Sequence, residues 1–468
     1  MKKSTSSVNK NDLNDPSGRR EFIKKASYGG LGVGLLGTVR TEETTSAADI
    51  STAETAMQKT PPKPAPKPPI KITDLRCAIM GNSPVVRILT DQGIEGYGQA
   101  ETAKPYLKPF VMFYKDYLIG EDPTNVERVM MKIRRMGSFK PYGSAVSAIE
   151  IALWDIAGKA AGLPVYKLLG GKIRDRVRCY NGSVRVERTG NERKDFLEWG
   201  EKIKALPQGF TIVKQAVGFH GGYNRTVPDF TYGNTSPSAS PKDVGRRGPI
   251  TEKGLKTIIE RVAFMKETLG DGIGLALDCG PGMVLSDAIR LAVALEPYNL
   301  MWCEDMLTGD YTPYVMADDY AELTRSTTTP IHTGEQLYLR QNFRELIEKN
   351  AVRVLGPDPE DMGGIAEMKW VSEYADLHSI QFAPHGTFDG LIGIAAQVQA
   401  GAAMPENYIA FEYCQANPAW WYDIVSGLPD PIVKNGLIDV WDAPGLGIEI
   451  DKKAAKQYLA EEDKNFFD

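Results

Sequence analysis

The chain has 468 residues and a hydrophobic content of 42%, which is enough for a substantial core and suggests two or three domains. Its 55 basic and 60 acidic residues give a net charge of -5 and offer no basic face for a polyanion, so we expect no nucleic-acid partner. The five cysteines are scattered without a Cys-x-x-Cys spacing and indicate neither a zinc knuckle nor a disulfide framework.

The N-terminus has the layout of a twin-arginine signal peptide. Arg19 and Arg20 are followed by Phe22, a glycine-rich apolar stretch and small residues up to Ala48. The alternative is a disordered basic tail. We interpret residues 1–48 as the signal and therefore expect a periplasmic or otherwise exported protein.

A proline-rich stretch at 49–69 reads as a linker, so the folded part should begin near Ile70. No later stretch is apolar and long enough to span a bilayer, so we expect no membrane span in the mature protein.

A small α+β domain is predicted over 70–175. Two strand-like runs at 85–90 and 94–97 flank Asp91-Gln92-Gly93, which is a hairpin signal. A helix is predicted after Ser144, because apolar residues then recur at helical spacing. These residues are Val146, Ile149, Leu153, Ile156, Ala157 and Ala160.

From 176 to 445 the pattern changes to short apolar runs, each followed by a helical segment, which is typical of a parallel sheet or a βα barrel. Each run ends in a polar residue, and most intervals match one βα unit of roughly 30 residues. The polar ends are Lys214, Asp278, Glu304, Glu335, Asp358, His385 and Glu412. In a barrel these residues form one ring at the carboxyl ends of the strands, where barrel enzymes keep their active sites.

An insertion at 218–250 interrupts this spacing. It contains Gly, Pro, Ser and Tyr without periodicity and is too long for an ordinary connection. It is either a lid or a disordered excursion. We favour the lid, because the insertion leaves the strand that carries Lys214 and so emerges beside the barrel mouth.

Asp278, Glu304 and Glu335 place three carboxylates on consecutive strands. Each alone would be read as a surface acid, but three converging carboxylates repel one another unless a hard divalent cation lies between them. The pattern therefore predicts a site for one Mg²⁺ per subunit.

His385 follows Asp358 one strand later. A carboxylate beside a histidine orients the imidazole and raises its basicity, which predicts a general base. Of the four histidines, His220 and His378 have no partner that the sequence reveals, and strand alternation predicts that His332 points away from the barrel axis.

Several motifs together resemble the mandelate racemase and muconate lactonizing enzyme group of the enolase superfamily. They are the helix from Ser147 to Lys159 with Leu168-Leu169-Gly170-Gly171, then Thr333-Gly334-Glu335, Pro357-Asp358 with Gly363-Gly364, and Ala383-Pro384-His385-Gly386. The resemblance covers nearly everything from Ile72 to Ile450.

The resemblance implies a modified TIM-type (β/α)7β barrel with an N-terminal α+β capping domain, and residues 446–468 returning to that cap. It implies Mg²⁺ on Asp278, Glu304 and Glu335, and an enediolate formed by loss of the proton next to a substrate carboxylate. It assigns acid/base catalysis to the Asp358–His385 pair and substrate binding to Glu412, and it implies a homo-oligomer.

Two departures from the family pattern matter. Racemases of this kind have Lys-x-Lys on the second strand, whereas this chain has Lys214, Gln215 and Ala216. Lys214 is therefore assigned to binding of the substrate carboxylate and charge stabilisation. Gly280 stands where some relatives have an Asn or His that touches the substrate.

With one clear base, dehydration of a sugar acid to a 2-keto-3-deoxy acid fits best. The alternatives are a racemase, epimerase or cycloisomerase in which a tyrosine or histidine of the insertion replaces the missing lysine, and an exported binding protein without turnover.

Overall fold

The computed structural model describes residues 68–101, 104–136, 140–182, 184–186, 192–232, 248–307, 316–386, 390–413 and 418–468. The predicted signal and linker lie outside these residues, apart from Pro68 and Pro69, and so does 233–247 of the insertion. Among the described residues no helix combines the length and the apolar character needed to cross a membrane.

A three-stranded antiparallel sheet opens the folded part. It consists of β1 (Ile72–Met80), β2 (Ser83–Thr90) and β3 (Glu95–Gln99), with β2 in the middle. The predicted hairpin is confirmed by the pairing of β2 with β3, and Gly93 in the turn has a φ of +73°, which favours glycine.

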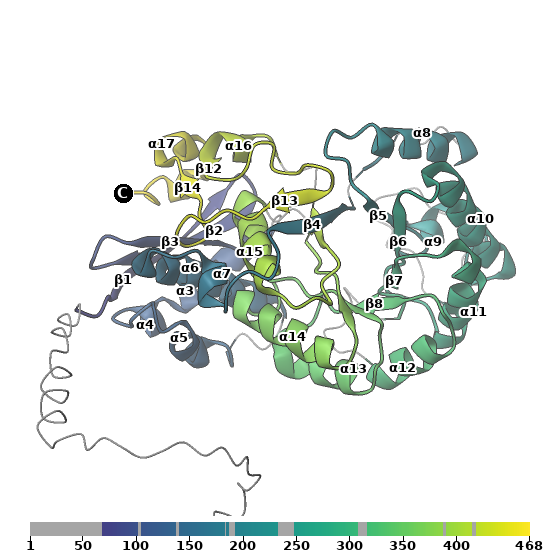
Figure 1. The fold of residues 1–468 in the computed structure, drawn as a ribbon, viewed down its shortest axis with the longest axis horizontal. Helices are drawn as coiled ribbons and strands as arrows, with labels where there is room; N and C mark the ends of the chain where they lie inside the picture. The colour runs from purple at the N-terminus through teal and green to yellow at the C-terminus, as the bar shows by residue number, and fades with distance from the viewer. Residues whose placement is uncertain are drawn as a thin grey trace, which may run out of the picture. The chain divides into compact units, whose positions relative to one another are not determined.

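Helix α6 (Lys140–Ala161) packs against β3 (Figure 1). The contact needs glycine, because a Cβ on Gly98 would lie 2.0 Å from the Ala148 carbonyl oxygen. The apolar face predicted after Ser144 is buried except at Ala160. The other elements of the cap are η1 (Pro105–Leu107), α3 (Lys108–Phe113), α4 (Lys115–Leu118), α5 (Val126–Ile133) and α7 (Val165–Leu168).

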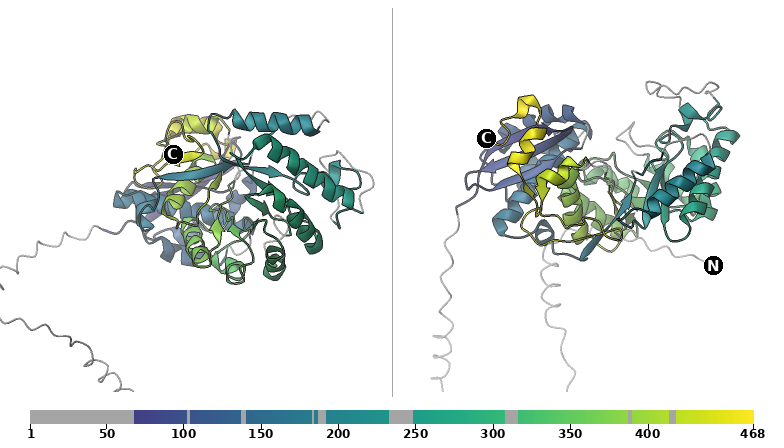
Figure 2. Two further views of the ribbon diagram at one scale, coloured as in Figure 1. Left: turned by 45° about the vertical axis from the view of Figure 1, so that its right-hand side comes forward. Right: turned by 90° about the horizontal axis from the view of Figure 1, so that it is seen from above.

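Eight parallel strands curl into the predicted barrel (Figures 1 and 2). They are β4 (Arg176–Asn181), β5 (Ile212–Ala216), β6 (Gly274–Asp278), β7 (Trp302–Glu304), β8 (Ile331–Thr333), β9 (Val354–Leu355), β10 (Gln381–Phe382) and β11 (Phe411–Tyr413). The order runs from β10 back to β4 and then to β11. Phe382 joins the two ends, because its amide donates to the Asn407 carbonyl at 2.9 Å and its carbonyl accepts from the Ile409 amide at 2.7 Å.

Helices follow the strands and lie on the outside of the curl (Figure 1). They are α8 (Glu192–Lys204), α10 (Glu252–Leu269), α11 (Leu285–Leu295), α12 (Ala317–Arg325), α13 (Arg344–Glu348), α14 (Ile365–Leu377) and α15 (Gly390–Ala403), with η2 (Glu296–Tyr298) and η3 (Arg340–Phe343). The insertion starts with α9 (Tyr223–Thr226). Tyr180, Ala276, Trp302 and Val354 form a buried cluster on the inner side of the strands.

The last part of the chain packs on the cap. Ala460 donates its amide to the Ile79 carbonyl at 2.9 Å, and the Ile79 amide donates to Asp463 at 2.8 Å. The elements after the barrel are α16 (Trp420–Ile424), β12 (Val425–Ser426), β13 (Leu437–Asp439), β14 (Glu449–Ile450), α17 (Lys452–Ala455), η4 (Lys456–Tyr458) and η5 (Glu461–Asp463).

Glu150 links the cap to the barrel. Its carboxylate accepts the amides of Ile365 at 2.8 Å and Ala366 at 2.9 Å, which are the first two residues of α14. Trp154 donates to the same carboxylate at 2.7 Å. Burial nevertheless raises the pKa of Glu150 to about 7, because the charged form loses its hydration.

Candidate active site

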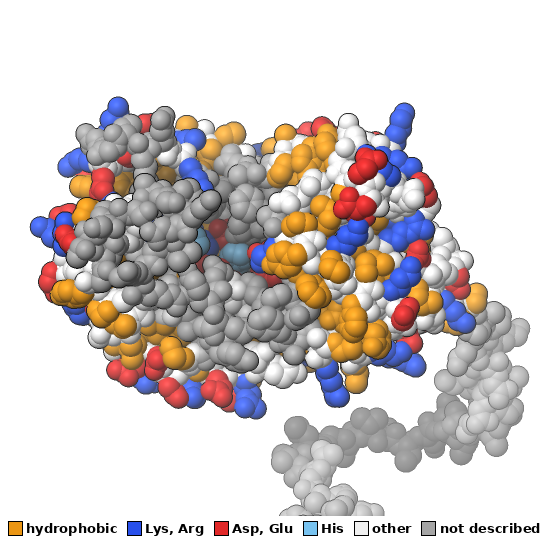
Figure 3. Space-filling model, turned by 180° about the vertical axis from the view of Figure 1, so that it is seen from behind, with side chains coloured by type: hydrophobic (Ala, Val, Ile, Leu, Met, Phe, Trp, Pro, Cys, Tyr) orange, Lys and Arg blue, Asp and Glu red, His pale blue; other side chains and the backbone are white. Residues whose placement is uncertain are grey.

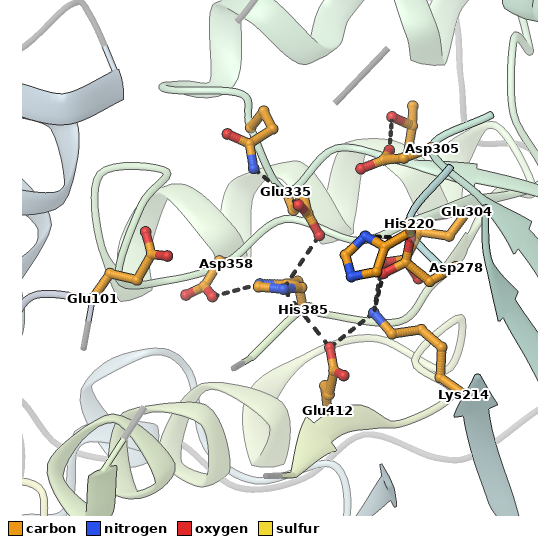
Figure 4. A network of polar contacts seen from close by, with 12 residues as sticks. Glu101, Lys214, His220, Asp278, Glu304, Asp305, Glu335, Asp358, His385 and Glu412 are labelled. Atoms are coloured by element: carbon orange, nitrogen blue, oxygen red, sulfur yellow. Dashed lines mark hydrogen bonds and ion pairs between the residues drawn. The ribbon is translucent and has the colours of Figure 1, made fainter. Parts of the chain in front are cut away.

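The polar residues predicted at the strand ends meet in one network at the carboxyl end of the barrel (Figure 4). Asp278 and Glu304 are the last residues of β6 and β7, and Glu335 lies two residues beyond β8. On the molecular surface, histidine and acidic atoms lie in a hollow on one face (Figure 3).

Lys214 on β5 is the cation at the centre of the carboxylates. Its Nζ lies 2.6 Å from Oε1 of Glu304, 3.0 Å from Oε2 of Glu412 and 3.9 Å from Oδ2 of Asp278. Burial alone would lower the pKa of Lys214, but Glu304 and Glu412 more than offset this and hold it well above its usual value. Lys214 therefore stays protonated and is unsuited to act as a base.

Asp278 lies between Lys214 and His220. Its Oδ1 is 3.2 Å from Nδ1 of His220. Burial raises the pKa of Asp278 to about 7, and the charges of Glu304 and Glu335 add to the increase. Glu304 behaves differently: burial alone would raise its pKa, but the charges of Lys214, His332 and His385 together lower it.

His385 is held from both sides of its ring. Nδ1 lies 2.8 Å from Asp358, while Nε2 faces Glu335 at 3.2 Å and Glu412 at 3.8 Å. Burial alone would lower the pKa of His385, but the carboxylates of Glu335, Asp358 and Glu412 raise it well above its usual value. The structure thus brings the predicted base and its partner together.

The carboxylates suit a hard cation by their chemistry. Asp278, Glu304 and Glu335 supply oxygen ligands, and the raised pKa of Asp278 shows the cost of burying their charges together. In the part of the chain that the structure describes, however, no three acidic, His or Cys side chains surround a common point closely enough to hold an ion. Instead, the carboxylates are each paired with Lys214, His220 or His385.

The prediction for His332 is wrong, because its side chain points into the barrel. It is fully buried and stacks on Trp302, with ring centres 5.2 Å apart, and its Nδ1 lies 3.5 Å from Glu304. His332 pairs in register with Glu304 and so shares its side of the sheet. Strand alternation fails as a guide because β8 ends at Thr333 and Gly334 turns the chain with a φ of +133°.

Asp305 and Glu101 at the site were not predicted from the sequence, and His220 entered only as the insertion histidine of the epimerase alternative. Asp305 has a φ of +51°, is buried, and accepts a hydrogen bond from Thr333 at 2.5 Å. His220 contacts Asp278, and Glu101 lies on the cap side of the network (Figure 4). Glu304 and Asp305 are visible as two adjacent acids, but no sequence pattern predicts that Asp305 is buried.

Comparisons with known proteins agree with this architecture. Residues 201–454 match the family model "Enolase C-terminal domain-like", and residues 55–170 match "Mandelate racemase / muconate lactonizing enzyme, N-terminal domain". The chain is similar to a solved mandelate racemase/muconate lactonizing enzyme-like protein from Rubrobacter xylanophilus, with 31% identity and a TM-score of 0.71 over 85% of this chain and 99% of that one.

Two curated relatives are dehydratases. D-xylonate dehydratase from Haloferax volcanii is 32% identical over 84% of this chain and 89% of its own length. D-galactonate dehydratase from Ralstonia pickettii is 29% identical over 78% of this chain and 88% of its own length. The chain therefore belongs to the enolase superfamily, in its mandelate racemase and muconate lactonizing enzyme group.

Proposed function

We propose that this enzyme dehydrates a sugar acid to a 2-keto-3-deoxy acid. The observation that carries the proposal is the Asp358–His385 pair facing the carboxylate network, set against Ala216 where a second lysine base would stand. The similarity to D-xylonate and D-galactonate dehydratases supports the substrate class.

Members of this superfamily typically use a divalent metal ion. We assign Mg²⁺ to Asp278, Glu304 and Glu335. When bound there, the ion would supply positive charge that attracts the substrate carboxylate and offsets the carboxylate charges that raise the pKa of His385.

The chain's own residues bind the substrate and transfer the proton. Lys214 stays charged and binds the substrate carboxylate, together with Glu412. Nε2 of His385 faces the substrate space and removes the α-proton, and Asp358 fixes the ring and stabilises the imidazolium that forms. The electron pair of the broken C–H bond moves into the carboxylate to form an enediolate, whose negative charge lies near Lys214.

An epimerase or racemase is the second candidate, because it needs an acid/base group on the other face of the substrate and His220 lies in the network. A screen of sugar acids with Mg²⁺, including D-xylonate and D-galactonate, tests the proposal. We expect loss of water and a 2-keto acid from at least one substrate. Inversion at the α-carbon without loss of water would instead show an epimerase. If the protein catalysed neither reaction, the result would favour a binding protein.

We also propose that the protein is exported through the twin-arginine route. Arg19, Arg20 and Phe22 of the sequence support this. Replacing both arginines by lysine should leave the protein in the cytoplasm with its N-terminus intact. Finding the wild type only in the cytoplasm of its native host would contradict the proposal.

A further inference from the structure

The turn that leaves β5 lies directly on the loop that leaves β6. The His220 amide donates to the Cys279 carbonyl at 3.1 Å, and the amides of Gly221 and Tyr223 bond back to Val217 and Gly218 at 2.9 Å. These main-chain bonds fix the position of His220 at the barrel mouth, although its turn has no regular secondary structure.

Gly280 leaves the space that His220 fills. A Cβ at position 280 would lie 2.5 Å from the His220 amide nitrogen and 2.6 Å from its Cβ, closer than such atoms approach. Gly280 also has a φ of +62°, which side chains rarely adopt. Position 280 therefore carries no side chain, and His220 from the other loop occupies the space that a side chain there would need.

The His220 ring is more exposed than the other nitrogen groups in the network. Its side chain is 45% exposed, compared with 5% for Lys214 and 13% for His385. Lys214 is held by Glu304 and Glu412, and His385 is held by Asp358. His220 contacts Asp278, and its side chain nevertheless remains partly exposed.

His220 and His385 come from opposite walls. His220 rests on the loop after β6, while His385 follows β10, and four steps separate these strands in the eight-stranded order. In Figure 4 the two rings lie on either side of the space between Glu335 and Lys214. A substrate seated between them would present one face to each histidine.

We propose that His220 is a second catalytic residue, which binds the departing β-hydroxyl of the substrate and gives it a proton. This inference rests on the proposed dehydration. His385 takes the α-proton, and the electron pair of the C–H bond enters the carboxylate. The pair then returns to form the Cα=Cβ double bond as the bond from Cβ to oxygen breaks. The hydroxide leaves as water with the proton from His220, and the enol gains a proton at Cβ and loses one from oxygen to give the 2-keto acid.

The test compares His220→Asn with wild type in D₂O, using Mg²⁺ and the sugar acid that the screen identifies. NMR follows exchange of the α-proton and formation of the keto acid. General acid catalysis is worth on the order of 100- to 10,000-fold. We expect keto-acid formation to fall by such a factor while α-proton exchange persists, because His385 is intact. His378→Asn, at the end of α14, is the matched control and should behave as wild type.

A 3-fluoro analogue of the same substrate sharpens the test. Fluoride leaves without needing a proton, so His220→Asn should release fluoride from the analogue nearly as fast as wild type. Keto-acid formation from the natural substrate at the wild-type rate would overturn the role of His220 and leave the proposed function standing. Loss of fluoride release as well would also overturn it, because His220 would then act on an earlier step.

Failure of the proposed function looks different. A wild-type enzyme that forms no keto acid from any sugar acid contradicts the dehydration and, with it, the role of His220. Inversion of the α-carbon by wild type that disappears in His220→Asn would make His220 the second base of an epimerase and would overturn both proposals.

Discussion

Nδ1 of His385 lies 2.8 Å from Oδ2 of Asp358, and main-chain bonds fix both residues. The His385 amide donates to the Pro357 carbonyl at 3.2 Å, and Oδ1 of Asp358 accepts the Glu360 amide at 2.7 Å. Asp358 is buried and therefore cannot swing away to solvent. The ring is consequently oriented with Nε2 toward the carboxylate network before any substrate arrives.

Replacement of His385 by Asn should lower turnover by on the order of 100- to 10,000-fold and leave substrate binding largely intact, because the side chain contributes mainly to proton transfer. Asp358→Asn should be milder, since it leaves the base but weakens its orientation. Steady-state kinetics of both variants check this. A fully active His385→Asn would show that another group removes the proton.

Glu335→Gln should weaken Mg²⁺ binding without unfolding the protein, because one anionic oxygen ligand is lost. Ligand binding at 100 times its dissociation constant stabilises a fold by about 2.7 kcal/mol, so excess Mg²⁺ should raise the melting temperature of wild type and raise that of the variant much less. Glu198→Gln, on the exposed side of α8, is the control. Full activity in excess chelator would contradict the metal site.

Gly280→Ala should reproduce much of the His220→Asn phenotype, since the added Cβ collides with the His220 backbone and displaces the turn. Gly272→Ala is the matched control, because a Cβ there meets nothing within 4 Å. Kinetics and melting temperatures of both variants separate lost catalysis from lost folding. Unchanged keto-acid formation in Gly280→Ala would mean that the turn tolerates displacement.

Glu150 should make stability depend on pH. Its pKa is about 7 in the fold, against 4.5 for the unfolded group, so the folded state binds the proton more tightly. Protonated Glu150 therefore contributes about 3 kcal/mol to the free energy of unfolding below pH 4.5. This contribution is lost as the pH rises to about 7.

Urea unfolding of wild type and Glu150→Gln at pH 4.5, 6, 7 and 8 checks this. The free energy of unfolding of wild type relative to the variant should fall between pH 4.5 and 7 and then level off. A relative stability that grows with pH would show that the amides of Ile365 and Ala366 keep the carboxylate ionised in the fold.

The sequence was a good guide where strand geometry decides the position. Asp278 and Glu304 end their strands, and successive parallel strands carry such residues to one edge, so their meeting with Lys214 was predictable. The cap hairpin was also predictable, because the residues of its turn indicate it directly.

The sequence was a poor guide where loops decide. The alternation that placed His332 outside the barrel stops at Gly334, so it says nothing about where Glu335 points. His220 reaches the site through a hydrogen bond to Cys279, which is distant in sequence, and its turn shows no periodicity. Gly218 and Gly280 were the available signal, because a Cβ on either glycine would meet the other loop.

The most direct test of the account follows the α-proton of the sugar acid in D₂O with wild type, His385→Asn and His220→Asn in the presence of Mg²⁺. We predict that wild type forms 2-keto acid without inverting recovered substrate, that His385→Asn loses both exchange and product, and that His220→Asn keeps exchange but loses product. Rapid inversion of the α-carbon that survives in His385→Asn would contradict both the assignment of the base and the dehydration.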